Sequence, residues 1–410
     1  MRFTRYHDGG LRRVRVLYSF PHKLGAGRIC YTAWQQVSGV ARAGAEVLAL
    51  PGVLQRPLPD KVDVWPTLAR GRWRIPYRLL GRLRACALHD WIVARRLPAL
   101  AHRIDIIHTW PLAALHTLRE AARLGIPAVL ERPNAHTRFA YRAVQEECER
   151  LGISLPANHE HSWNDAVLAR EEEEYREAYR VLCPSEFVLQ TFLDQGFPRD
   201  HLVRHEYGFD ETVFYPIEKP RNGERGLTVL FVGVCAVRKG LHFALQAWLN
   251  SPAHQEGKFL IAGEFLPAYA RKLAFQLADP SVHVLGHRED VAQLMRQSDI
   301  LVLPSIEEGF GLVCAEAMGS GCVPLVSNAC TDICVHGENA LVHRVGDVAA
   351  LTQHLTMLQQ NRELLLGLRA GCLRAAPRHN WNAAGTKLLE LYRRILWAKA
   401  TTDMGLALSA

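Results

Sequence analysis

Residues 304–318 read Pro-Ser-Ile-Glu-Glu-Gly-Phe-Gly-Leu-Val-Cys-Ala-Glu-Ala-Met, and they join an expected strand to an expected helix. The four residues before them, Ile300 to Leu303, form a continuous apolar run, which is typical of parallel strands that are buried on both faces. Gly309 and Gly311 allow a tight turn, and the chain resumes as a helix from Leu312. The pattern predicts a strand, a glycine turn and a helix N-terminus in close succession.

This segment contains two glutamates whose carboxylates could bind a ligand. Glu308 lies in the turn, and Glu316 lies about one turn into the helix. A carboxylate accepts hydrogen bonds from two hydroxyl groups at once, so one glutamate suits the diol of a hexose and the other that of a ribose. The helix N-terminus attracts a diphosphate or sugar hydroxyls through its free N–H groups and its positive dipole end. These features predict a sugar-nucleotide site; the alternative is a solvated helix start with two surface glutamates.

The spacing of Glu308 and Glu316 resembles a known motif. Seven residues separate them; Glu308 lies in Pro-Ser-x-x-Glu-Gly-Phe-Gly-Leu, and Glu316 begins the Glu-Ala-Met that follows. Together they resemble the E-x7-E motif of retaining GT-B glycosyltransferases of glycosyltransferase family 4. The resemblance runs from about residue 14 to 392 and is most specific from 228 to 340. It implies an α/β fold of the GT-B type, in which two Rossmann-like domains with parallel sheets face each other across a cleft. The donor-binding residues that it implies here are Glu308, Gly309, Phe310, Gly311, Leu312 and Glu316.

A second strand-to-helix turn carries two cations. Residues 227–232 form another apolar run, which ends at Gly233, and Arg238 and Lys239 follow it. Two fixed cations at such a turn suit a pyrophosphate leaving group. In the family that the chain resembles, a basic pair here holds the donor diphosphate, and Lys239 matches its lysine. Many members place an arginine directly after the strand glycine, where this chain has Val234, and Arg238 is expected to replace it. The alternative is a solvated Arg-Lys turn.

The N-terminal half shows the same alternation of strands and helices. Residues 14–18 predict a strand, Gly25-Ala26-Gly27 a flexible loop, and residues 28–43 a helix. The resemblance implies that Gly25 and Gly27 approach the donor phosphates, in a loop where the family often has adjacent glycines. It also implies that His136 lies near the reacting sugar; the alternative is a loop histidine with a structural partner. His108, near the end of another expected strand, is expected to line the acceptor side.

Length and patterning predict two domains. A chain of 410 residues is too long for one core. Strands alternate with helices in both halves, which predicts parallel sheets with right-handed crossovers. We expect domains over residues 1–215 and 216–380, and the resemblance implies that the first binds the acceptor and the second the donor. The resemblance adds a C-terminal helix, residues 381–400, that packs back on the first domain.

Positive charge is concentrated near the N-terminus. Residues 1–105 contain 19 Lys and Arg against 6 Asp and Glu, whereas the whole chain has a net charge of +8. Arginines alternate with apolar and aromatic residues over residues 70–96, a pattern that suits an anionic membrane surface. The alternative is a solvated face whose apolar residues turn inward. No nucleic-acid partner is expected, because no motif for RNA or DNA accompanies the charge.

The expected cellular location and the expected lack of a metal site both rest on motifs that the sequence does not contain. No signal peptide or run of 18 apolar residues is apparent, so we expect a cytoplasmic protein, peripheral on the inner face of the membrane if residues 70–96 bind lipid. We expect no metal and no cofactor, because there is no Asp-x-Asp pair and His159-Glu160-His161 has no convincing partner set. The acidic run from Glu171 to Glu174 is expected to face solvent.

The resemblance implies a function. It is the transfer of a hexosyl unit from a nucleotide-diphosphate sugar to a hydroxyl of a glycan or lipid-linked glycan, with retention, without metal, in cell-envelope or exopolysaccharide biosynthesis. The catalytic residues that it implies are Glu308, His136, Lys239 and Arg238, and Gly233 joins the donor-binding set. Two alternatives remain open: another double-Rossmann sugar-nucleotide enzyme, such as a phosphorylase or an epimerase, and a catalytically silent sugar-nucleotide-binding protein.

Overall fold

The computed structural model describes residues 13–70, 73–74, 80–217 and 226–408. By their contacts these residues form two compact units. One contains the described residues within 1–130, 177–179 and 385–410, and the other contains those within 131–176 and 180–384. The domain boundaries expected from the sequence, 1–215 and 216–380, stay a prediction.

A seven-stranded sheet has the strand order β3-β2-β1-β6-β7-β8-β9. Its strands are β1 (Arg15–Leu24), β2 (Glu46–Leu54), β3 (Val62–Val64), β6 (Ile106–Thr109), β7 (Ala128–Glu131), β8 (Arg180–Cys183) and β9 (Leu202–Arg204). The pairs recorded for it are parallel, as expected from apolar runs separated by helices. A short antiparallel pair, β4 (Ala69–Arg70) and β5 (Trp73–Arg74), lies outside this sheet.

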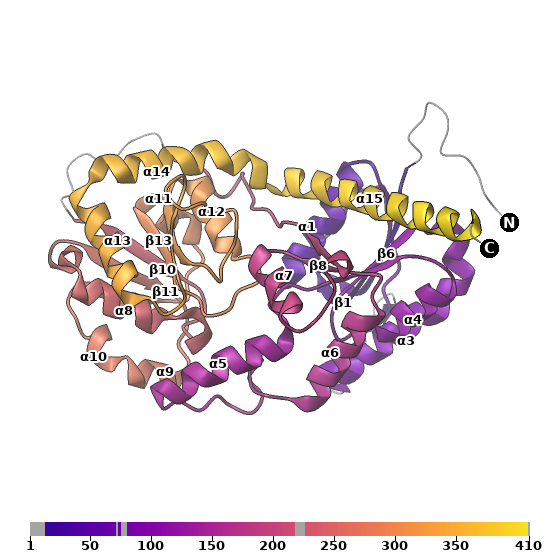
Figure 1. Ribbon diagram of the computed structural model, residues 1–410, viewed down its shortest axis with the longest axis horizontal. Coiled ribbons are helices and arrows are strands. Elements are labelled where there is room, and N and C mark those ends of the chain that lie inside the picture. The colour runs from indigo at the N-terminus through magenta and orange to yellow at the C-terminus, as the bar shows by residue number, and fades with distance from the viewer. Residues whose placement is uncertain (1–12, 71–72, 75–79, 218–225, 409–410) are drawn as a thin grey trace. The chain divides into compact units, whose positions relative to one another are not determined.

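Helices separate most of these strands along the chain, although β3 follows β2 without one (Figure 1). They are α1 (Ile29–Arg42), α3 (Arg82–Leu100), α4 (Leu115–Arg123), α5 (Thr137–Leu151), α6 (Asp165–Glu177) and α7 (Glu186–Leu193). Helix α1 lies within one residue of its expected bounds, and α3 packs against α4 and β1. The C-terminal helix α15 (Trp381–Leu408) begins at the expected residue and continues eight residues further than expected.

A six-stranded parallel sheet has the order β12-β11-β10-β13-β14-β15. Its strands are β10 (Thr228–Val232), β11 (Lys258–Ala262), β12 (Val282–Gly286), β13 (Ile300–Leu303), β14 (Val323–Ser327) and β15 (Leu341–His343). Its helices are α8 (Leu241–Asn250), α9 (Pro267–Lys272), α10 (Ala274–Leu277), α11 (Val291–Gln297), α12 (Leu312–Ser320), α13 (Val348–Gln360) and α14 (Arg362–Ala375). Helix α8 packs with α13, whereas α12 packs with both α11 and α14 (Figure 1).

The core of the second unit lies on both faces of this sheet. β10 and β13 are buried along their whole length, which explains why their sequences are continuous apolar runs rather than alternating ones. Trp248 of α8 and Phe259 of β11 are fully buried in this core. The two strands therefore form a rigid base for the loops that follow them.

The acidic run in α6 was expected to face solvent, and that expectation is wrong for two of its four residues. Glu171 and Glu174 are buried. Glu171 pairs with the buried Arg132 at 3.2 Å, and Glu174 pairs with Arg170 at 3.0 Å. A helix that lies between solvent and core turns some of four consecutive side chains inward, and a buried carboxylate is tolerated there because it has a cationic partner.

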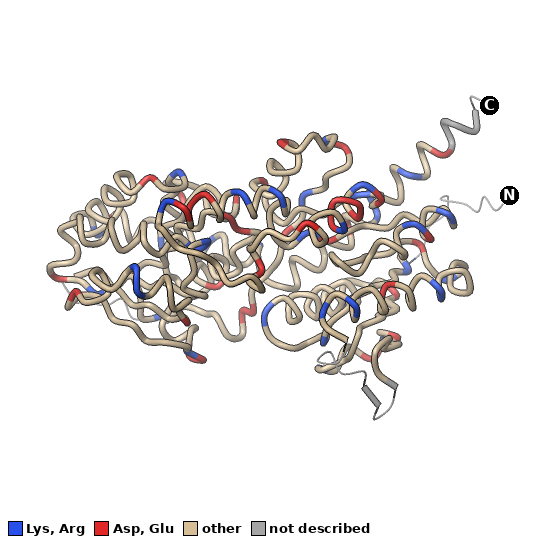
Figure 2. Tube along the Cα trace, turned by 90° about the horizontal axis from the view of Figure 1, so that it is seen from below, with Lys and Arg blue, Asp and Glu red and all other residues tan. Residues whose placement is uncertain are grey.

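The basic stretch over residues 70–96 is described only in part, because residues 71–72 and 75–79 lie outside the described residues. In α3, Arg84, Trp91 and Arg95 are exposed. Figure 2 shows Lys and Arg interspersed with Asp and Glu along the chain. Membrane binding by this stretch stays a prediction. Among the described residues, no helix is both long and apolar enough to cross a membrane.

Candidate functional site

Two neighbouring strands bring the predicted donor residues together. β10 and β13 pair in parallel, so the loops that follow them start from the same edge of the sheet. The loop after β10 carries Arg238 and Lys239 on a short 3-10 turn, η3 (Val237–Lys239), and the loop after β13 carries Glu308. The backbone N–H of Ile306 donates to the carbonyl oxygen of Arg238 at 2.8 Å and joins the two loops.

Gly240 makes this approach possible. It ends η3 with a φ of +66°, and a Cβ at this position would lie 2.0 Å from the carbonyl oxygen of Pro304. Both the left-handed backbone and the contact exclude other residues. The glycine after the Arg-Lys pair is therefore required by the packing of one loop against the other.

Glu308 lies at the centre of the cluster. Its carboxylate accepts a hydrogen bond from Lys239 Nζ, and Arg238 Nη1 lies 3.4 Å from its Oε1. Ser305 Oγ donates to Oε2 at 3.3 Å, and the backbone N–H of Gly309 donates to Oε1 at 3.2 Å. Burial by itself would raise the pKa of Glu308, but Lys239 and Arg238 hold this pKa below its usual value. Glu308 is therefore an ionised acceptor at neutral pH.

The neighbouring residue, Glu307, is part of the same cluster and was not predicted from the sequence. Its side chain is 0% exposed. Arg238 Nη1 lies 3.3 Å from its Oε2, His161 Nε2 lies 3.4 Å from the same oxygen, and the backbone N–H of Ala135 donates to Oε1 at 2.9 Å. Burial opposes ionisation, but the Arg238 charge and the His161 hydrogen bond hold the pKa of Glu307 well below its usual value.

A sequence signal for Glu307 was present. Two adjacent carboxylates follow β13, and two adjacent cations follow the neighbouring strand β10. Two half-buried cations favour two counter-charges, so the second glutamate was the natural partner of the second cation. The structure shows that Arg238 contacts both carboxylates, whereas Lys239 contacts Glu308.

Glu316 has a different environment. It lies in α12, is partly exposed, and has no hydrogen bond or ion pair recorded within the described part of the chain. Burial raises the pKa of Glu316 to about 7. A carboxyl group without a protein partner remains available to hydroxyl groups of a ligand.

The other residues of the glycine turn contact the protein itself. A Cβ at Gly309 would lie 1.6 Å from the carbonyl oxygen of Pro133, and Gly311 starts α12 with a φ of +65°. Phe310 is buried, and its ring packs edge-on against Tyr207 with centroids 5.5 Å apart. Leu312 is half-buried at the start of α12. The close approach that requires glycine at position 309 is thus an approach to backbone, and donor contacts by these residues stay a prediction.

Gly233 lies at the end of β10 with a φ of +138°, beside the Lys239 side chain, whose Cε would lie 3.9 Å from an added Cβ. Gly25 and Gly27 belong to the other unit. Gly25 has a φ of +89° and abuts Arg56, whereas Gly27 has open space around its Cα. Their predicted contacts with donor phosphates stay predictions.

His136 is the N-cap of α5, where its Nδ1 accepts a hydrogen bond of 3.3 Å from the backbone N–H of Arg138. The ring is 1% exposed and packs against Tyr175, Phe192 and Phe197. Burial lowers its pKa to about 3, so the imidazole is neutral at neutral pH. The predicted contact with the reacting sugar stays a prediction, although almost none of the ring is accessible in this conformation.

The structure also buries His108, for which an acceptor-lining position was expected. Its ring is 0% exposed, stacks on Tyr18 and shares a 2.7 Å hydrogen bond with Tyr392 Oη. No metal cluster is recorded among the described residues, where groups of three or more His, Cys, Asp or Glu side chains in suitable positions are lacking. His161 of the His-Glu-His triplet contacts Glu307 instead.

Solved structures show the class of fold. The chain superposes on sucrose-phosphate synthase from Thermosynechococcus elongatus with a TM-score of 0.68 at 18% identity, covering 94% of this chain and 100% of that one. It superposes on HepE of Anabaena, solved in complex with UDP, with a TM-score of 0.63 at 17% identity, covering 93% and 100%. Together with two parallel α/β sheets and charged loops at strand ends, this likeness defines the GT-B fold.

Sequence comparison supports the resemblance to glycosyltransferases. Residues 226–361 match the model of the glycosyl transferases group 1. The chain is 25% identical over 401 residues to a D-inositol 3-phosphate glycosyltransferase of Xylanimonas cellulosilytica, covering 86% of this chain and 88% of the relative. A second relative is an N,N'-diacetylbacillosaminyl-diphospho-undecaprenol alpha-1,3-N-acetylgalactosaminyltransferase of Campylobacter jejuni, to which the chain is 29% identical over 118 residues. This match covers 28% of this chain and 31%, about a third, of the relative. The matched segment, residues 226–361, is that of a group 1 glycosyltransferase, in agreement with the predicted resemblance, and the predicted fold is confirmed.

Proposed function

We propose that this protein is a retaining, metal-independent glycosyltransferase. It moves a hexosyl unit from a nucleotide-diphosphate sugar to a hydroxyl of a glycan or lipid-linked glycan. The observation that carries the proposal is the cluster of Lys239, Arg238 and Glu308 where β10 and β13 end. Support for the substrate classes comes from relatives: HepE is a structure with UDP, and the Campylobacter enzyme is named for a diphospho-undecaprenol substrate.

The two cations suit the donor diphosphate. An ammonium group has three donors, and one Lys239 donor is directed at Glu308, so two remain for phosphate oxygens. Arg238 is held in place by the carbonyl oxygen of Glu307 at 2.9 Å, which fixes a positive charge before the donor arrives. Such preorganised charge stabilises the leaving nucleoside diphosphate as the glycosidic bond to it breaks.

The two predicted glutamates suit the two diols of the donor. Glu308 is ionised, so it accepts hydrogen bonds from hexose hydroxyls. Glu316 has no recorded protein partner in the described residues, so its carboxyl group is available to the ribose. Each glutamate therefore contributes to donor orientation, which is a large part of catalysis when the protein supplies no reacting group.

The anomeric configuration is retained because the acceptor hydroxyl attacks the sugar on the same face from which the nucleoside diphosphate departs. The C1–O bond to the diphosphate breaks, the acceptor oxygen forms a bond to C1, and the acceptor proton passes to the departing phosphate oxygen. Glu308 is not proposed as a nucleophile; its carboxylate is proposed only to orient the hexose, while Lys239, Ser305 and Gly309 hold it in place. The protein supplies charge, orientation and exclusion of water.

The test is turnover of a panel of UDP-, GDP- and ADP-sugars with glycan and lipid-linked acceptors, in buffer with EDTA. We expect nucleoside diphosphate to be released only as product forms, with the anomeric configuration of the donor kept in the product. Glu308→Ala and Lys239→Ala should each lower kcat/KM by about two orders of magnitude or more. Glu363→Gln, which alters an exposed glutamate of α14 outside this cluster, is the matched control and should leave turnover unchanged.

The same panel separates the alternatives. A phosphorylase would require inorganic phosphate as co-substrate, and an epimerase would convert the donor without an acceptor. A silent binding protein would show only a thermal shift; a ligand at 100 times its dissociation constant stabilises a protein by about 2.7 kcal/mol. Full transfer activity of Glu308→Ala would contradict the proposal.

The biological setting is proposed as cell-envelope or exopolysaccharide biosynthesis, at the inner face of the cytoplasmic membrane. Residues 70–96 would then contact anionic lipid headgroups, at about 1 kcal/mol for each cation near the surface. Co-sedimentation with vesicles that contain anionic lipid, compared with neutral vesicles, tests this part independently of catalysis.

A further inference from the structure

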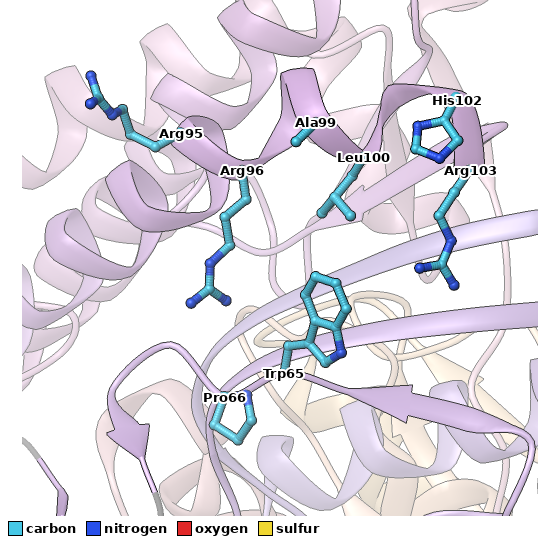
Figure 3. Close-up of a pocket in the computed structure, with 8 residues that line it drawn as sticks. All are labelled: Trp65, Pro66, Arg95, Arg96, Ala99, Leu100, His102 and Arg103. Carbon is cyan, nitrogen blue, oxygen red and sulfur yellow. The ribbon is translucent and has the colours of Figure 1, made fainter.

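An open pocket of about 680 Å³ lies in the first unit, between the end of α3 and the segment after β3 (Figure 3). Its volume is within the range of small-molecule sites. One wall comes from the last residues of α3 and from η1 (Ala101–Arg103), the other from residues 65–66. The residues that line it are Trp65, Pro66, Arg95, Arg96, Ala99, Leu100, His102 and Arg103. None of them is acidic.

Of the arginines that line this pocket, Arg96 is the best placed to bind an anionic ligand. Its side chain is half-buried, and Figure 3 shows its guanidinium directed from α3 toward the opposite wall. Within the described residues no hydrogen bond or ion pair is recorded for it. A partly desolvated guanidinium without a counter-charge is a costly arrangement that an anionic ligand would relieve.

Arg103 and Arg95 differ from Arg96. Arg103 pairs with Asp63 at 3.3 Å, but the two side chains are 49% and 61% exposed, so the pair is weak and exchangeable. In Figure 3 the Arg103 side chain extends from η1 toward the wall that carries Trp65, whereas the Arg95 side chain points away from the other lining residues. Arg95 instead lies over the Trp91 ring, 5.4 Å from its centroid. Two of the three arginines therefore face one space.

The opposite wall is aromatic and held by the sheet. The backbone N–H of Trp65 donates to the Ala49 carbonyl oxygen at 2.9 Å, which continues the pairing of β3 with β2. The Trp65 side chain is 40% exposed, and Leu100 lies across from it in Figure 3. An indole with open area suits the apolar face of a sugar ring, and the nearby guanidinium groups suit an anionic substituent on that ring.

We propose that this pocket binds an anionic saccharide, a sugar that carries a phosphate or carboxylate group. The anion contacts Arg96 and Arg103, and the sugar ring lies against Trp65. A flat lipid surface is disfavoured because the cations and the indole line a concavity instead of projecting from the protein. The site shares no residue with the predicted donor site, so the proposal does not depend on the transfer reaction.

Titration calorimetry of the full chain at low salt tests the proposal, with glucose 6-phosphate, glucuronate, inorganic phosphate and glucose as probes. We expect saturable binding of the two anionic sugars, weaker binding of phosphate, and none of glucose. Arg96→Gln should weaken binding about tenfold and Arg103→Gln several-fold. Arg95→Gln removes the same charge as a matched control and should change the affinity less than threefold. Trp65→Leu should weaken binding of the sugars but not of phosphate.

Competition and vesicle binding separate this pocket from the donor site and from a membrane surface. UDP should not compete, and Lys239→Ala should bind the anionic sugars as the unaltered chain does, whether or not the protein transfers sugar. Equal losses from Arg95→Gln and Arg96→Gln would overturn the proposal, since they would indicate a general charge effect. So would the absence of saturable binding to either anionic sugar. Binding to anionic vesicles alone, lost in Arg96→Gln, would assign the surface to a membrane and overturn it too.

Discussion

Glu307 accepts a hydrogen bond of 2.9 Å from the backbone N–H of Ala135, a residue 172 positions away in the chain. The same carboxylate contacts Arg238 and His161. The residue next to the predicted Glu308 is therefore a structural centre, which holds one of the two predicted phosphate-binding cations and the loop before α5. Because its carboxylate is fully buried, removing its charge leaves the guanidinium of Arg238 less well compensated.

Glu307→Gln should lower the free energy of unfolding by about 3–5 kcal/mol at pH 7, as for other buried pairs that lose one partner. The lowered pKa of Glu307 means that its contribution is present above the unfolded pKa and is lost as the pH falls through the folded pKa. The difference from the unaltered protein should therefore shrink at acid pH. Urea denaturation measures it, and Glu363→Gln, on an exposed glutamate of α14, is the control; equal stability of the two variants would contradict this role.

Glu316→Gln should have the opposite effect on stability. The pKa of Glu316 is raised to about 7, so the folded protein holds a proton that the unfolded chain releases near pH 4.5. Stability is lost as the pH rises between these values, by at most about 3 kcal/mol above pH 7. Replacing Glu316 with Gln removes this cost, so the variant should melt higher at pH 8 and similarly at pH 4.5. Melting curves across this range check it, and donor affinity should fall in the same variant.

His136→Asn tests whether His136 acts as the N-cap of α5 or as a contact to the reacting sugar. Asparagine keeps an N-cap acceptor for α5 but removes the ring. The pKa of His136 is lowered to about 3 by burial, so protonation of the unfolded chain below pH 6.5 destabilises the fold. The variant should lose less stability than the unaltered protein between pH 6.5 and 4.5. Because the ring is buried, we expect kcat/KM to stay within about tenfold; a loss of two orders of magnitude would instead support the predicted sugar contact.

Gly309→Ala tests whether the glycine turn is required by the protein itself. The new methyl group would lie 1.6 Å from the Pro133 carbonyl oxygen, so one loop has to move. We expect a loss of about 2–3 kcal/mol in unfolding free energy, as for overpacking. Gly367→Ala in α14, where an added Cβ meets nothing within 4 Å, should instead stabilise by about 0.5–1 kcal/mol. Equal melting temperatures for the two variants would show that the loop adapts.

Local patterns predicted the elements that carry the site. β13 has the expected bounds, β10 starts one residue later than expected, and α12 starts at Leu312 as expected. A strand that is buried on both faces must be apolar along its length, and a helix after a glycine turn begins where the turn ends. The meeting of Arg238, Lys239 and Glu308 could also be predicted, because the carboxyl ends of neighbouring parallel strands meet at one edge.

The sequence by itself determined the two-sheet α/β plan, the match of residues 226–361 to the group 1 glycosyltransferases, and the residue types at the ends of β10 and β13, because these depend on short periodic patterns and on residue type. Only the tertiary structure decided which side chains have partners. It placed Glu307 against Ala135 and His161, buried His136 among aromatic rings, turned Glu171 and Glu174 inward, and left Arg96 facing Trp65. Burial and pairing arise from contacts between residues far apart in the chain, and local periodicity carries no information about them.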